Sequence, residues 1–116
     1  YGYGMRTPYA AAKWALIGLV KSLAIELGPH AVRINAICPG SVDGPRMRGV
    51  IERQAAATGS SVSEVEADYL TGQSISRFVQ PSEIADMCLF LASPAAAMVS
   101  GQAIAVDGNT ETFHLS

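Results

Sequence analysis

A tyrosine and a lysine lie four residues apart near the start of the sequence, in Tyr9-Ala10-Ala11-Ala12-Lys13. On a helix, positions i and i+4 share one face, about one turn apart. A tyrosine with an ordinary pKa of about 10 is a poor base at neutral pH, but a fixed positive charge beside the phenol stabilises the phenolate. Such a pair can exchange a proton with an alcohol or carbonyl oxygen. The same spacing also arises by chance in ordinary helices, so the surrounding elements must decide between the two interpretations.

The residues around this pair predict a helix over about 8–27. Thr7 is a good N-cap, Pro8 suits the first turn, and Gly28-Pro29 indicates the end. Apolar residues recur along it at steps of three and four, which is one helical stripe: Ala12, Leu16, Leu19, Leu23 and Leu27. We expect Trp14 and this stripe to form core or a subunit interface.

A β-prone run follows the helix and ends in a turn. Its length and apolar residues (Val32, Ile34, Ala36 and Ile37) predict a short buried strand that stops at Pro39, because proline cannot continue a central ladder. We expect Asn35 to satisfy backbone groups. Ligands of open α/β sheets bind beyond the carboxyl ends of the strands, and Pro39-Gly40 is a place where bare backbone can approach one. The alternative is that Pro39-Gly40 forms an ordinary turn after a strand and binds no ligand.

Three more helices and a second strand are predicted further along the chain. The predicted segments are a helix over about 45–57, a helix capped by Ser61 and running through Leu70, a loop over 73–79, a helix from Pro81 to Ser93-Pro94, and a strand over 103–106 that ends in Asp107-Gly108-Asn109. Strands separated by long helical crossovers are normally parallel, and parallel sheets normally have several strands. We therefore expect the chain to be a piece of a larger domain, or to need partner strands.

Composition narrows the function classes. The chain has 116 residues, 49% of them apolar and 16% charged, with a net charge of -2, which fits one small globular domain. Scattered basic residues do not predict nucleic-acid binding, and no run approaches the roughly 20 apolar residues of a membrane span. The opening Tyr1-Gly2-Tyr3-Gly4 does not resemble a signal peptide. It lacks an initiating Met, so we expect an upstream segment to be missing or removed.

Cysteines and histidines do not predict a metal site. Cys38 and Cys88 are far apart in the sequence, so we interpret both as reduced, buried small hydrophobes. His30 and His114 are isolated, which favours surface or loop positions over metal binding. A reducing, cytoplasmic setting is expected.

Three segments together carry a specific resemblance to a known family. Residues 7–16, 32–40 and 100–108 resemble the active-site helix, the following strand with its cofactor loop, and the last strand of the short-chain dehydrogenase/reductase family, in family order and spacing. The resemblance covers essentially the whole chain and corresponds to the family's carboxyl-terminal half. It implies an α/β fold with a Rossmann-like doubly wound parallel sheet, of which residues 1–116 would be the C-terminal portion of a single domain.

The resemblance also implies roles for particular residues. Tyr9 would be the acid/base, and Lys13 would assist it and hydrogen-bond the nicotinamide ribose. Pro39, Gly40 and Val42 would line the nicotinamide of NAD or NADP, with the Val42 backbone holding its carboxamide. Residues of about 45–76 would cover the substrate, a secondary alcohol or ketone. A homotetramer or homodimer is the implied assembly.

This sequence departs from the family pattern in several places. The Gly-rich phosphate loop, the catalytic serine, the helical asparagine and the residue that selects NAD or NADP belong to the upstream half, which the sequence lacks. Gly44 stands where family members usually carry threonine, and this removes a hydroxyl that could bind the cofactor. The neighbouring Arg46 either compensates electrostatically or is a solvated helix start.

Two other interpretations remain open from the sequence alone. Related epimerases and dehydratases also use a Tyr-Lys pair, although the compact length after Lys13 and the Val-Asp-Gly ending favour a dehydrogenase/reductase. The second alternative is a truncated product without catalytic function. It would only associate with other chains through its exposed helix and strand edges. We expect the segment alone to be inactive, because cofactor phosphates would lack their glycine loop.

Overall fold

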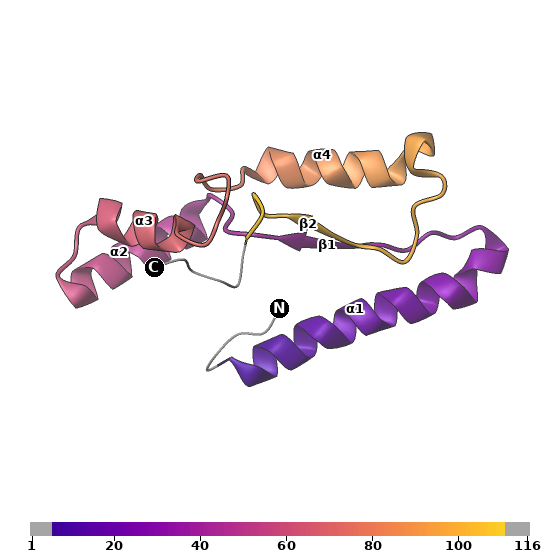
Figure 1. The fold of residues 1–116 in the computed structure, drawn as a ribbon, viewed down its shortest axis with the longest axis horizontal. Coiled ribbons are helices and arrows are strands. Elements are labelled where there is room, and N and C mark those ends of the chain that lie inside the picture. Colours follow the sequence, from indigo (N-terminus) through magenta and orange to yellow (C-terminus); the bar gives the residue numbers. More distant parts are fainter. Residues whose placement is uncertain (1–5, 111–116) are drawn as a thin grey trace. The chain divides into compact units, whose positions relative to one another are not determined.

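The computed structural model describes residues 6–110 and shows helices alternating with two short strands (Figure 1). The strands β1 (Ala36–Pro39) and β2 (Ala103–Val106) are paired and parallel. The remaining elements are α1 (Thr7–Leu27), η1 (Gly28–His30), α2 (Pro45–Thr58), α3 (Val62–Leu70), α4 (Pro81–Ala92) and η2 (Pro94–Ala96), where η denotes a short 3-10 helix. The expected α/β class, with parallel strands joined by a helical crossover, is confirmed.

The chain divides into two compact units. The first unit contains Tyr1–Cys38 and Cys88–Ile104, and the second contains Pro39–Met87 and Ala105–Ser116. The boundary crosses both strands, so each unit holds one end of the β1–β2 pair. The first unit therefore carries α1, and the second carries α2, α3 and the loop after β1.

The limits of α1 agree with the predicted helix, but its caps differ. The predicted Thr7 cap is wrong: the Arg6 carbonyl accepts the Ala10 N–H at 2.9 Å, which makes Arg6 the N-cap and Thr7 the first helical residue. At the other end, Gly28 stays right-handed (φ -52°), and the left-handed reversal falls on Ala31 (φ 59°). The chain tightens into η1 before it turns, since a 3-10 turn satisfies the last carbonyls first.

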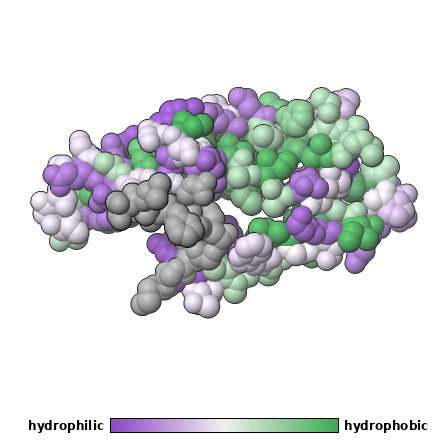
Figure 2. Space-filling model, viewed as in Figure 1, coloured by the Kyte–Doolittle hydropathy of each residue, from purple (hydrophilic) through white to green (hydrophobic). Residues whose placement is uncertain are grey.

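The apolar stripe of α1 is not core within its own unit. No residue of α1 is buried, and Trp14, Leu16, Leu19 and Ile25 are all among the exposed large apolar side chains. Of the two predicted roles, core is not seen in the part of the chain that the structure describes. The subunit interface stays a prediction. In Figure 2, apolar residues also gather around the end of α4 and the segment after it, where Leu89, Phe90 and Met98 are exposed.

Strand β1 is shorter than predicted and begins at Ala36. The Ile34 N–H donates to the Ser100 hydroxyl at 3.2 Å, and the Asn35 side chain binds Val99 and Gln102. The Gly101 N–H already donates to the Ile34 carbonyl at 2.7 Å, and the regular strand starts where the Ala36 N–H donates to the Gln102 carbonyl at 2.8 Å. The expected backbone role of Asn35 is confirmed, and its side-chain bonds explain why the strand starts late.

Helices α2 and α3 pack together in the second unit around a small apolar core (Figure 1). The buried members are Ile51, Ala55, Val65 and Phe78, with Met47, Tyr69 and Leu70 packed against them. The predicted Ser61 cap is confirmed, since its hydroxyl accepts the Glu64 N–H at 3.1 Å. This core holds the two helices as one body.

The cysteines are less buried than expected. Both are free, but Cys38 is half-buried and Cys88 is exposed, because Cys88 lies on the outward face of α4. His30 is exposed on η1, whereas His114 lies outside the described residues. Among residues 6–110 no cluster of three potential metal ligands is found, and no helix there is long and apolar enough to cross a membrane.

Candidate active site

Helix α1 brings Tyr9 and Lys13 together on one exposed face. The Lys13 ammonium nitrogen lies 5.4 Å from the centroid of the Tyr9 ring, within the range of a cation–π contact. The Tyr9 side chain is 46% exposed, so an incoming molecule can reach it. The predicted shared face of the pair is confirmed.

The loop after β1 approaches the end of β2 very closely at Gly40. Its N–H donates to the Val106 carbonyl at 3.0 Å. A Cβ on residue 40 would lie 2.7 Å from the Asp107 Cβ and 2.8 Å from the Asp107 Cα, which is closer than atoms can pack. Glycine is therefore required here by the strand next to it, a reason that the sequence did not reveal.

Val42 presents its own backbone groups away from the neighbouring segment. It forms a parallel bridge with Val79, in which the Val79 N–H donates to Ser41 (2.9 Å) and the Asp43 N–H donates to Val79 (2.8 Å). In a parallel bridge of this pattern the central residue's N–H and C=O point to the opposite side. No described residue bonds to either group of Val42, so both are available to a ligand.

Arg48 joins several parts of the second unit, and sequence reasoning missed this role. Its guanidinium binds Asp43 at 3.0 Å, contacts Glu66 on α3, and lies 5.4 Å from the centroid of the Phe78 ring. The hydrogen bond from Arg48 lowers the pKa of the Asp43 carboxyl. Arg48 therefore links the loop after β1 to both helices.

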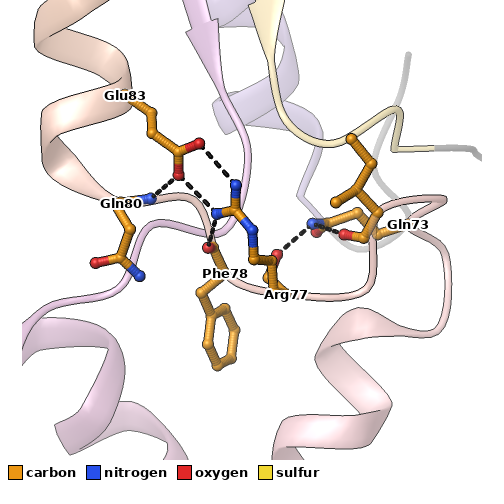
Figure 3. Close-up of polar contacts among 6 residues, drawn as sticks. Gln73, Arg77, Phe78, Gln80 and Glu83 are labelled. Atoms are coloured by element: carbon orange, nitrogen blue, oxygen red, sulfur yellow. Dashed lines mark hydrogen bonds and ion pairs between the residues drawn. The ribbon is translucent and has the colours of Figure 1, made fainter.

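A second polar cluster organises the loop that leads into α4 (Figure 3). Arg77 binds Glu83 through both carboxylate oxygens, at 2.7 and 2.8 Å, and the Gln80 N–H donates to the same carboxylate at 2.8 Å. Glu83 is the third residue of α4, so it acts as the acidic half of a capping box. The Arg77 hydrogen bond, followed by the Gln80 N–H, lowers the pKa of Glu83 to about 2.

The same loop is tied to the residues after β2. The N–H groups of Ser74 and Ile75 donate to the carbonyls of Asn109 (3.1 Å) and Gly108 (2.9 Å). The buried Gln73 amide donates to the carbonyls of Ile75 and Arg77 at 2.7 and 2.6 Å. The segment between residues 44 and 72 is thus attached by main-chain bonds at both of its ends, through residues 41–43 and 73–75.

The predicted site residues fall into two groups. Tyr9 and Lys13 belong to the first unit, while Pro39, Gly40 and Val42 lie on one continuous loop of the second. An open hollow of about 300 Å³ in the second unit adjoins this loop, where Val79, Val106 and Asp107 contribute to its wall. A groove of about 630 Å³ in the first unit runs along the other end of α1, near Ala24 and Arg33. None of the five predicted site residues lines either hollow.

Comparison with known proteins identifies the family. Residues 2–109 match the family model described as enoyl-(acyl carrier protein) reductase. A short-chain dehydrogenase of Penicillium roqueforti, anuF, is 41% identical over 103 residues, which is 89% of this chain and 34% of that protein. The chain belongs to the short-chain dehydrogenase/reductase family.

Two solved structures show the corresponding fold. A variant of actinorhodin polyketide ketoreductase with NADPH superposes with a TM-score of 0.84 at 34% identity, over 97% of this chain and 43% of that one. A 3-oxoacyl-(acyl-carrier protein) reductase from Brucella melitensis with bound NAD gives a TM-score of 0.68 at 34% identity, over 88% of this chain and 32% of that one. This chain therefore spans between about a third and two fifths of the length of these relatives.

Proposed function

We propose that this chain supplies the proton-transfer pair and part of the nicotinamide pocket of an NAD(P)-dependent oxidoreductase that interconverts a secondary alcohol and a ketone. The observation that carries the proposal is the Lys13 ammonium held against the Tyr9 ring on one exposed face of α1. Family membership supports it. So do the names of the two solved relatives, a ketoreductase and an oxoacyl reductase.

In the reducing direction, the Tyr9 phenol gives its proton to the carbonyl oxygen of the substrate, and the Lys13 charge stabilises the phenolate that is left. Lys13 also hydrogen-bonds the ribose hydroxyls of the cofactor. NAD(P)H, when bound, supplies the hydride that the carbonyl carbon receives. In the oxidising direction, the Tyr9 phenolate takes the alcohol proton.

The loop over residues 39–42 has the chemistry that a nicotinamide needs. A carboxamide offers one acceptor and two donors, and Val42 presents one unbonded N–H and one unbonded C=O on the same side of its loop. Pro39 and Gly40 place little side chain beside it. We assign the carboxamide to Val42. The cofactor phosphates need residues outside these 116, because the sequence contains no Gly-rich phosphate loop.

Residues of about 45–76 form the cover over the substrate in this proposal. The shared core and the Arg48 contacts support a cover that moves as one body rather than as a loose loop. Covers of this kind exclude water from the reaction and often limit turnover. The assembly that we propose is a homodimer or homotetramer, in which a second subunit covers the exposed apolar face of α1.

The test is to substitute the pair in the full-length protein that contains this chain. Tyr9→Phe removes the proton donor, so kcat should fall by about 10²–10⁴ while cofactor affinity changes little. Lys13→Met should lower both kcat and cofactor affinity. Stopped-flow turnover and fluorescence titration with NADH and NADPH measure the two effects.

Ser22→Ala is the control, because it removes an exposed hydroxyl from the same helix, outside the proposed site and cover. We expect its kcat to stay within about twofold of the parent, as is usual for an exposed surface position. Turnover by Tyr9→Phe at the rate of this control would overturn the proposal.

A further inference from the structure

Helix α1 carries the proposed proton-transfer pair. None of its residues is fully buried, and its apolar residues Ile17, Val20, Leu23, Ala24 and Leu27 are only partly covered. Polar contacts within its unit therefore add to this partial apolar packing in fixing the position of the helix. The ammonium of Lys21 donates to the carbonyl of Gly101 at 2.9 Å, joining residues 80 positions apart. A hydrogen bond from a charged donor is stronger than a neutral one.

The partner carbonyl belongs to an unusual residue. Gly101 has a left-handed backbone (φ 71°), and its N–H donates to the Ile34 carbonyl at 2.7 Å. A Cβ at this position would lie 3.3 Å from the Cβ of Ala24 on α1. Gly101 thus contacts α1 through its carbonyl and leaves little room for a side chain beside Ala24, while its N–H binds the segment that leads into β1.

The turn that contains Gly101 is itself held tightly. We call Val99–Gln102 the Gly101 turn. The Asn35 side chain donates to the Val99 carbonyl at 2.9 Å and accepts the Gln102 N–H at 3.1 Å. The Arg33 guanidinium adds a second bond to Val99 at 3.3 Å. With the Ser100 hydroxyl bonded to the Ile34 N–H, most of the turn is bound to residues 33–35, and it offers α1 a rigid support.

We propose that Lys21 is a positioning residue for Tyr9 and Lys13, because it holds α1 against the Gly101 turn. This inference rests on the proposed function. Lys21 lies eight residues, or about 12 Å along the helix axis, from Lys13. A helix is stiff over this length, so a shift at Lys21 displaces the pair as well. Displacements of about 1 Å can cost a reaction up to about a hundredfold in rate.

The experiment compares three variants of the full-length protein. Lys21→Met keeps the length of the side chain and removes the donor, Lys21→Arg keeps a donor, and Ser22→Ala alters the exposed neighbour on the same helix. We expect Lys21→Met to lower kcat by about three- to thirtyfold and to raise cofactor KM less than Lys13→Met does, since the pair is displaced but the Lys13 ammonium is retained. Lys21→Arg should restore most of the rate, and Ser22→Ala should match the parent.

A second measurement does not depend on activity. Trp14, the one tryptophan of the chain, follows Lys13 on α1. In Lys21→Met, we expect faster amide hydrogen exchange along α1 and a shift of the Trp14 emission, with the exchange of α2 and α3 unchanged. If Lys21→Met does not fold well enough to assay, Lys21→Gln tests the same contact, because its shorter, neutral side chain cannot hold the Gly101 carbonyl as the ammonium does. It should produce a fall in kcat of the same order.

Different results would overturn the positioning role of Lys21 and the proposed function. A Lys21→Met protein with the parent's kcat, or with a loss that Lys21→Arg does not restore, overturns the positioning role while Tyr9→Phe remains impaired. If Tyr9→Phe itself retains its turnover, the proposed function fails, whatever Lys21 shows.

Discussion

At the scale of single residues, the close approach between Gly40 and Asp107 sets the position of the candidate cofactor loop. The sequence pointed to Gly40 as a place where bare backbone could meet a ligand. The structure shows that this bare backbone approaches the end of β2, where a Cβ on residue 40 would overlap Asp107. The glycine is therefore needed for the packing of the loop against β2, whatever a ligand requires.

Gly40→Ala should destabilise the protein and weaken cofactor binding. The added Cβ would lie 2.7 Å from the Asp107 Cβ, and relieving such an overlap should cost about 1–3 kcal/mol of unfolding free energy and move the loop. Urea unfolding and nicotinamide cofactor titration measure both effects.

Gly44→Ser is the matched control for this substitution. Nothing lies within 4 Å of a Cβ at residue 44, and its backbone is extended. A serine at this N-cap of α2 should be neutral or stabilising by a few tenths of a kcal/mol. Equal stability of the two variants would contradict the steric argument. The open space also shows that the threonine usual in the family could be accommodated here.

At the scale of elements, helices α2 and α3 owe their packing to a core of a few side chains. Ile51 is completely buried between them. Ile51→Ala should therefore lower the free energy of unfolding by about 2–5 kcal/mol, through lost burial and the cavity that remains. Chemical denaturation followed by circular dichroism is the measurement.

Ile75→Ala offers a control with the same residue type outside the core. Ile75 is 58% exposed in the loop before α4, so its truncation should change stability by no more than about 0.5 kcal/mol. If the two alanine variants were equally stable, the core between α2 and α3 would be much looser than the structure shows.

The ion pair at the start of α4 predicts a pH dependence with a defined sign. The Arg77 guanidinium holds the pKa of Glu83 at about 2, below its ordinary value of 4.5. A carboxyl with a lowered pKa stabilises the folded state above its unfolded pKa, and this contribution is lost as the pH falls from about 4.5 through about 2. Glu83→Gln should therefore lower the melting temperature at pH 7, and the difference from the parent should shrink towards pH 2.

Thermal unfolding at several pH values checks this expectation. Glu26→Gln is a suitable control, because it removes the same charge from an exposed position of α1. A difference between Glu83→Gln and the parent that stayed constant from pH 7 to pH 2 would show that the Arg77 pair does not stabilise the fold.

At the scale of the whole molecule, local patterns predicted the helices well. The four α-helices found among residues 6–110 agree closely with the predicted segments at both ends. The predictions used proline and glycine signals, the period of apolar residues and the Ser61 cap. The start of β1 could not be predicted, because it depends on Asn35 and Ser100, which lie far apart in the sequence. The exposure of Cys88 was missed for a related reason, since burial depends on which layers cover a face.

In the candidate site too, local contacts could be predicted from the sequence and contacts between distant segments could not. Tyr9 and Lys13 could be found from the sequence because their contact is local, one turn of a helix. The contacts of Arg48 with Glu66 and Phe78, and of Lys21 with Gly101, join distant segments. Single-sequence patterns carry no signal for such pairs. The resemblance to the family supplied the role expected of Val42, and that role stays a prediction.

The main-chain attachment of the segment between residues 44 and 72 has a consequence for how such proteins diversify. Its entry is bonded to Val79 and its exit to Gly108 and Asn109 through peptide groups, which every amino acid but proline provides. Side chains in between can be exchanged, lengthened or shortened without altering these bonds. In the function that we propose, α2 and α3 can therefore be exchanged as one unit, and substrate preference would change there while the loop around Val42 keeps its form.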